Sequence, residues 1–167
     1  MRQAIAISIY LCLTLGFAHI SLAQTWRRLV PLHSTRVDVK NLLGRPLFEE
    51  KRPIDTYDVK EGRLNIMYVL QRCEQGLPAD WGNWDVPPGT VANVEISLKK
   101  SIRLVNLKIP NVEKYKWYTD DAGFTYYRIE RDGIEYEVQN GKVTSIVYGP
   151  SEKDKALICK DAPKIKY

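Results

Sequence analysis

Residues 124–150 read FTYYRIERDGIEYEVQNGKVTSIVYGP and contain the strongest structural signal in the chain. Two dipeptides, Asp132-Gly133 and Asn140-Gly141, favour tight turns because Gly, Asn and Asp tolerate positive φ angles. The flanking residues are mostly β-branched or aromatic, and such residues favour extended strands. The stretch therefore predicts three consecutive antiparallel strands, at 124–130, 134–138 and 143–148.

Residues 33–46, HSTRVDVKNLLGRP, predict a short helix. Thr35 and Asp38 form a capping-box pattern, so the helix is expected to begin near residue 36. Gly44 and the proline two residues later end it after about two turns. Because so short a helix is marginal alone in water, we expect its apolar stripe to pack on a sheet. The stripe consists of Val39, Leu42 and Leu43.

Between these regions the alternation of apolar and polar residues predicts further strands. Residues 54–59 and a strand ending at Cys73 form a hairpin around Glu61-Gly62, and residues 90–98 form another strand. The Gly- and Pro-rich residues 74–89 predict a loop. Residues 102–117 fit either a strand or a short helix. In the second strand of the hairpin, the residues expected on one face are Leu64, Ile66, Tyr68 and Leu70.

Together these elements predict an α+β fold, an antiparallel sheet with one or two short helices packed on one face. The second helix is expected at 152–157, where Ser151 and Asp154 repeat the capping pattern. Residues 34–72 and 102–148 each place a hairpin after a helical or ambiguous segment. This similarity suggests a duplicated helix-strand-strand unit.

Residues 1–23 have the features of a secretory signal peptide: Arg2, an apolar run over 5–17, and a small-x-small cleavage site, Ser21-Leu22-Ala23. The apolar run is too short and interrupted for a transmembrane helix, which needs roughly 20 apolar residues. No cysteine follows the cleavage site, so a lipid anchor is not indicated. We therefore expect residues 24–167 to form a single exported domain, secreted or periplasmic, with no transmembrane segment.

The expected mature chain contains two cysteines, Cys73 and Cys159. In an exported protein, an isolated pair is most simply a disulfide. Closing a loop of about 85 residues stabilises the fold by up to roughly 4 to 5 kcal/mol. A catalytic or metal-binding thiol would need partners that the sequence does not supply, so we expect no metal and no cofactor.

The mature chain has 24 Lys and Arg against 20 Asp and Glu. These charges are interspersed, and no run of five or six like charges occurs. The sequence therefore does not predict binding to nucleic acid.

Candidate catalytic residues are few. His33 is the only histidine after the signal and lies just before the helix cap, where a surface position is expected. Asp120-Asp121, or Glu130 with Glu135, could serve a glycosidase in principle. Adjacent acids before a glycine are more typical of a turn, so we assign no catalytic residue.

Trp81 and Trp84 lie in the sequence DWGNWDVPP, the one stretch with binding character. Loop aromatics can stack on sugars or anchor a protein partner. The structural interpretation is that Trp84 covers the sheet edge, and we expect it to be the more buried of the two. Both remain candidate binding residues.

The sequence STRVDVKNLLGRP followed by GRLNIMYVL resembles the opening of the SmpA/OmlA family of small outer-membrane lipoproteins, in which a capped helix ending in Leu-Gly-x-Pro precedes a hairpin. The resemblance covers residues 34–72. The chain as a whole also resembles small exported bacterial proteins of unknown function. It lacks the lipid-modified cysteine of SmpA/OmlA proteins and is longer, so their role in outer-membrane assembly does not transfer directly.

These observations favour a non-enzymatic, exported or envelope-associated binding module whose partner could be an envelope protein or a glycan. The alternative is a hydrolase acting on cell-wall or carbohydrate substrates.

Overall fold

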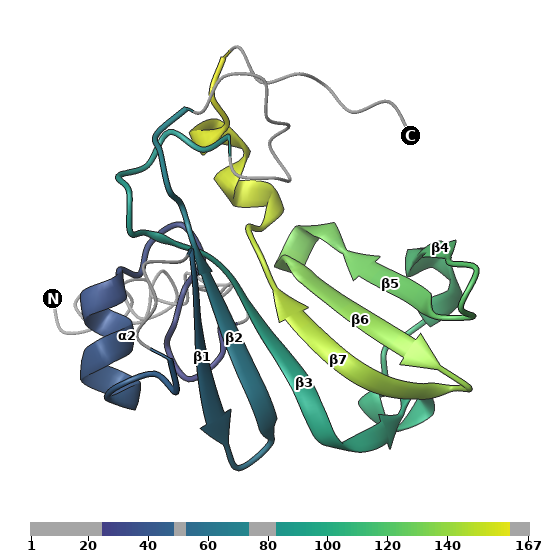
Figure 1. The fold of residues 1–167 in the computed structure, drawn as a ribbon. Helices are drawn as coiled ribbons and strands as arrows, with labels where there is room; N and C mark the ends of the chain where they lie inside the picture. Colours follow the sequence, from purple (N-terminus) through teal and green to yellow (C-terminus); the bar gives the residue numbers. More distant parts are fainter. Residues whose placement is uncertain (1–24, 49–52, 74–82, 161–167) are drawn as a thin grey trace, which may run out of the picture.

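The computed structural model describes residues 25–48, 53–73 and 83–160. Within these ranges, seven strands form one antiparallel sheet in the order β1-β2-β3-β7-β6-β5-β4 (Figure 1). The long β3 joins the two halves of the sheet, with β1 and β2 on one side and β4 to β7 on the other. The strands are β1 (Ile54–Val59), β2 (Gly62–Tyr68), β3 (Val91–Arg103), β4 (Lys116–Thr119), β5 (Thr125–Ile129), β6 (Ile134–Gln139) and β7 (Lys142–Tyr148).

The three C-terminal strands match the prediction to within one residue at each end. Asn140 and Gly141 both have positive φ angles, 51° and 70°, at the turn between β6 and β7. The turn between β5 and β6 contains a 3-10 helix, η4 (Glu130–Asp132), followed by Gly133 at φ 68°. Local turn chemistry therefore determines the register of this half of the sheet.

The predicted helix is present as α2 (Arg36–Leu43), with both hydrogen bonds of the capping box between Thr35 and Asp38. Val39 is completely buried against the sheet, and Leu43 packs at the margin of the same core. The prediction for Leu42 was wrong, because 45% of its surface is exposed. A two-turn helix on a curved sheet contacts it along a narrow line, and Leu42 lies outside that line.

The end of β2 differs from the prediction. β2 ends at Tyr68 rather than Cys73, because a register irregularity at Met67/Tyr68 interrupts pairing with β3. The backbone N–H of Val69 then donates to Thr90 instead. Leu70 consequently lies beyond the strand and is 62% exposed, whereas Leu64, Ile66 and Tyr68 are buried as expected.

Residues 102–117, which fitted either a strand or a short helix, contain both kinds of structure. β3 extends to Arg103, five residues beyond its predicted end. Two 3-10 helices follow, η2 (Leu104–Leu107) and η3 (Val112–Tyr115), and then the edge strand β4. A further 3-10 helix, η5 (Glu152–Leu157), occupies the predicted bounds of the second helix and has the predicted capping box.

The predicted disulfide between Cys73 and Cys159 is present, with the two Cα atoms 5.5 Å apart. It connects the segment after β2 to the segment after η5. Among the described residues, no helix is both long and apolar enough to cross a membrane.

Candidate functional site

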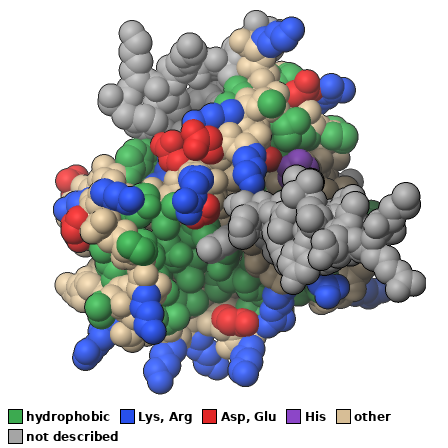
Figure 2. All heavy atoms as spheres, turned by 180° about the vertical axis from the view of Figure 1, so that it is seen from behind, with side chains coloured by type: hydrophobic (Ala, Val, Ile, Leu, Met, Phe, Trp, Pro, Cys, Tyr) green, Lys and Arg blue, Asp and Glu red, His purple; other side chains and the backbone are tan. Residues whose placement is uncertain are grey.

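One face of the sheet is apolar across both halves. The register places Leu64 opposite Ile96, Ile96 opposite Ile146, and Ile146 opposite Tyr136. On this face Leu64 and Ile96 are buried, whereas Tyr136 and Ile146 are only half-buried. Figure 2 shows this face as an apolar hollow with Lys and Arg side chains along its lower edge.

The positive charge of the protein is concentrated beside this hollow. Residues 99–117, from the end of β3 to the start of β4, contain six Lys and Arg and one Glu, a net charge of +5. The full chain also has a net charge of +5, so the remainder is neutral overall. All six cations are exposed. The six residues are Lys99, Lys100, Arg103, Lys108, Lys114 and Lys116.

A pocket of about 810 Å³ opens among these cations, at the junction of β3, η2 and the turn between β6 and β7. We call it the basic pocket. Its size falls within the range of roughly 300–1,000 Å³ typical of small-molecule sites. The backbone N–H of Leu104 donates to the Gly141 carbonyl at 3.0 Å, which attaches η2 to the turn. The lining residues are Arg103, Leu104, Val105, Lys108, Ile109, Val112, Asn140, Gly141 and Lys142.

Two cations of the basic pocket lie at directly opposite positions on neighbouring strands. Arg103 on β3 and Lys142 on β7 are register partners. Like charges directly opposite one another on neighbouring strands destabilise a sheet. Within the described ranges, no acidic side chain forms an ion pair with Arg103, Lys108 or Lys142. This arrangement favours the binding of an anionic ligand, whose charge would balance that of the three cations.

Glu113 is the one acid among residues 99–117, and its carboxylate contacts Tyr127. The Tyr127 hydroxyl donates to Glu113 Oε1 at 3.3 Å. Burial raises the pKa of Tyr127, and the Glu113 carboxylate raises it further. Tyr127 therefore stays neutral and serves as a hydrogen-bond donor to this carboxylate.

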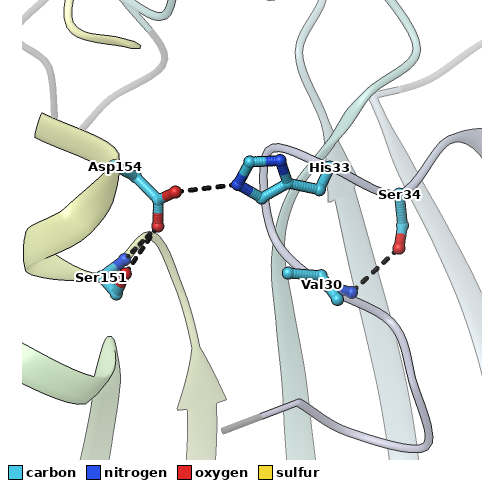
Figure 3. A network of polar contacts seen from close by, with 5 residues as sticks. All are labelled: Val30, His33, Ser34, Ser151 and Asp154. Carbon is cyan, nitrogen blue, oxygen red and sulfur yellow. Dashed lines mark hydrogen bonds and ion pairs between the residues drawn. The ribbon is translucent and has the colours of Figure 1, made fainter. Parts of the chain in front are cut away.

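His33 lies on the surface as expected, but it connects distant parts of the chain (Figure 3). Its Nε2 is 2.9 Å from Oδ1 of Asp154 in η5. The other oxygen of Asp154 accepts from the backbone N–H and the hydroxyl of Ser151, at 2.7 and 2.8 Å. Burial acts to raise the pKa of Asp154, but these hydrogen bonds together hold it below its usual value.

The His33 network does not have the order of a hydrolytic triad. In a triad, histidine lies between the serine and the acid, whereas here Asp154 lies between Ser151 and His33. The Ser151 hydroxyl is hydrogen-bonded to the carboxylate and not to the imidazole. The network therefore fastens η5 to the segment before α2.

The candidate acids also have structural partners. Asp120 accepts from the backbone N–H of Phe124 at 2.8 Å and thereby closes the turn between β4 and β5. Glu135 accepts from Nε of Arg128 at 2.7 Å. The same guanidinium lies over the Trp117 ring, 3.5 Å from its centroid. Asp121 and Glu130 are exposed in turns.

Of the two candidate tryptophans, Trp84 is buried, with 7% of its surface exposed. It packs with Leu32, Val69 and Val86 beneath the disulfide end of the molecule. Its position matches the interpretation that Trp84 covers the sheet. Trp81 lies outside the described residues, so its role as a binding residue stays a prediction.

Sequence reasoning missed the basic pocket because it searched for uninterrupted runs of like charge. A count over a window of about 20 residues would have identified residues 99–117. Nothing local could have identified Lys142, which joins the pocket through strand pairing. Among the residues that the structure describes, no group of three or more His, Cys, Asp or Glu side chains could hold a metal ion.

Comparisons with protein-family models, with curated proteins and with solved structures found no match to this chain.

Proposed function

We propose that the protein is an exported, non-enzymatic binding module and that it binds an anionic ligand at the basic pocket. The observation that supports this function best is the pairing of Arg103 with Lys142 at a pocket that also contains Lys108 and several apolar side chains. Two facing cations cost stability, and a bound anion would offset that cost. Such pairs are therefore expected where a ligand supplies the opposite charge.

Export is the second part of the proposal. It is supported by the charged, apolar and small-residue segments of residues 1–23, and a disulfide is most stable in an oxidising compartment. The helix and hairpin of residues 34–72 resemble the opening of SmpA/OmlA proteins, which supports an envelope location. A duplicated helix-strand-strand unit remains a separate proposal about the origin of the fold.

The hydrolase alternative has less support. Asp120 and Glu135 are each held by a neighbouring donor, and Asp154 faces an imidazole without a nucleophile. A binding surface accounts for the concentrated charge, whereas a hydrolase would leave it unexplained.

The test uses the mature chain, residues 24–167, with its disulfide intact. Binding to two soluble polyanions, heparin and poly-glutamate, is measured by titration calorimetry at low salt. We expect measurable binding to at least one of them, and severalfold weaker binding for Arg103→Glu and for Lys142→Glu. Lys40→Glu on α2 makes the same change in net charge away from the basic pocket and should leave binding nearly unchanged.

Two results would contradict the proposed function. One is that neither heparin nor poly-glutamate binds at low salt. The other is an equal loss for Lys40→Glu and Lys142→Glu, because it would show that only the net charge matters.

A further inference from the structure

The most exposed large apolar side chain in the described part of the protein lies at the rim of the basic pocket. Val105, in η2, has 77% of its surface exposed, and Ile102 just before it has 37% exposed. Val105 is flanked by Arg103 and Lys108, and all three residues line the pocket. This end of the molecule therefore combines a protruding apolar residue with three cations of the pocket lining.

We propose that the basic pocket docks on an anionic lipid surface, with Val105 entering the interface between head groups and acyl chains. This inference rests on the proposed function, because it names the class of anion that the pocket binds. Lipid phosphates would contact Arg103, Lys108 and Lys142, while the apolar lining faces the acyl region.

The charge distribution supports a surface rather than a small soluble anion. A site for a small anion usually has donors that converge on one point and are partly desolvated. Here the cations are exposed and spread along residues 99–116, on β3, η3, β4 and the residue that follows η2. Long Lys and Arg side chains in such positions can reach head groups while their aliphatic parts cover apolar surface.

The exposed valine favours lipid over an acidic protein partner. An acidic protein would also neutralise the cations, but a single protruding aliphatic residue among exposed cations is the combination by which proteins bind at a bilayer surface. At a bilayer surface the two features act together, because partitioning gains from apolar burial and from attraction to anionic lipids. Each cation near such a surface is worth about a fivefold change in partitioning.

The two features can be separated by variants with matched controls. Val105→Ser removes the apolar contact and keeps the charge. Val37→Ser makes the same substitution on α2, at a site that is 66% exposed. Lys142→Glu reverses one charge of the pocket, and Lys40→Glu again serves as its control. All four positions are on the surface, where substitutions rarely disturb folding.

The experiment measures cosedimentation of the disulfide-bonded mature chain with vesicles. One vesicle preparation contains equal parts phosphatidylglycerol and phosphatidylcholine, and the other contains phosphatidylcholine alone. We expect binding to the anionic vesicles only, with a steep decrease as salt is raised. Val105→Ser should reduce partitioning into the anionic vesicles about fivefold to tenfold relative to Val37→Ser. Lys142→Glu should weaken binding to vesicles and polyanions alike, and neither control should change either measurement.

Several results would overturn the lipid inference. If polyanions bind but anionic vesicles do not, the inference is wrong while the proposed function stands. The same conclusion follows if Val105→Ser and Val37→Ser partition equally well. If the protein binds vesicles of phosphatidylcholine alone as well as it binds the anionic vesicles, the cations do not contribute to binding and the inference is wrong. If neither polyanions nor vesicles bind, both the inference and the proposed function fail.

Discussion

Arg103 and Lys142 occupy directly opposite positions on β3 and β7, so two cations meet at the wall of the basic pocket. They are separated by 39 residues in the sequence and are brought together only by strand pairing. Like charges at directly opposite positions destabilise a sheet, so we expect the pair to lower stability in a way that can be measured independently of binding.

Lys142→Glu should therefore stabilise the protein slightly. The substitution turns a repulsive cross-strand pair into an attractive one, and the free energy of unfolding should rise by about 0.5 kcal/mol at low salt. Urea denaturation at low and high salt measures the effect, which should shrink as salt screens the charges. A lower stability than the wild type at low salt would contradict the proposed repulsion.

Asp154 should give the protein a component of acid sensitivity. Its pKa in the folded state is held below the usual value of 3.8, so the unfolded state takes up the proton first as the pH falls. The stabilisation is fully present at pH values above the pKa of the unfolded state. It is lost as the pH decreases through the pKa of the folded state. Unfolding measured from neutral to acidic pH should show this decrease in the wild type.

Two variants identify the source of that acid sensitivity. Asp154→Asn keeps an oxygen for the Ser151 N–H but cannot titrate, so its stability should vary less over the same acidic range. His33→Ala removes one of the groups that lower the pKa of Asp154 and should therefore reduce the acid-dependent loss. An unchanged acid profile in Asp154→Asn would show that other carboxyl groups dominate.

Gly133 and Gly141 form a matched pair for testing the turns of the C-terminal strands. Their φ angles are 68° and 70°, so replacement by alanine strains the backbone similarly. A Cβ at Gly141 would meet open space, whereas one at Gly133 would overlap the Gly149 carbonyl and lie 2.9 Å from the Pro150 carbonyl carbon. Gly141→Ala should cost about 1 kcal/mol, and Gly133→Ala about 3 kcal/mol or more. Equal costs, measured by chemical denaturation, would mean that residues 149–150 can move away.

Trp84→Ala should be strongly destabilising. Its indole is buried among aliphatic residues near the disulfide, and truncating a large aromatic residue in a packed site costs about 3 kcal/mol or more. Differential scanning calorimetry of the disulfide-bonded variant checks this value. A melting temperature close to that of the wild type would indicate that this end of the molecule packs loosely.

The elements that the sequence predicted well are those specified by near neighbours. The three C-terminal strands follow from Asp132-Gly133 and Asn140-Gly141, and α2 follows from the cap at Thr35 and the glycine after Leu43. These signals act over a few residues through steric limits on φ and through hydrogen bonds to adjacent backbone groups. The disulfide was predictable for a different reason, because only two cysteines follow residue 23.

The errors occurred where distant contacts override local pattern. Alternation alone extended β2 to Cys73, but its register with β3 shifts between Met67 and Tyr68, the strand ends at Tyr68, and Leu70 is exposed. Helical spacing placed Leu42 against the sheet, yet the contact surface of a two-turn helix is too narrow to cover it. In both cases, the burial of a residue depends on the shape of the partner surface, which the segment itself does not encode.

The turns, the helix cap, the cysteine pair and the excess of positive charge over residues 99–117 can be read from the amino-acid sequence alone. The pocket beside this charge cannot, because it forms where strand pairing brings Lys142 opposite Arg103 and where a backbone hydrogen bond attaches η2 to Gly141. Local signals fix torsion angles within a few residues. The pocket instead depends on the register between strands that lie far apart in the chain, and that register is set by burial of the whole apolar face.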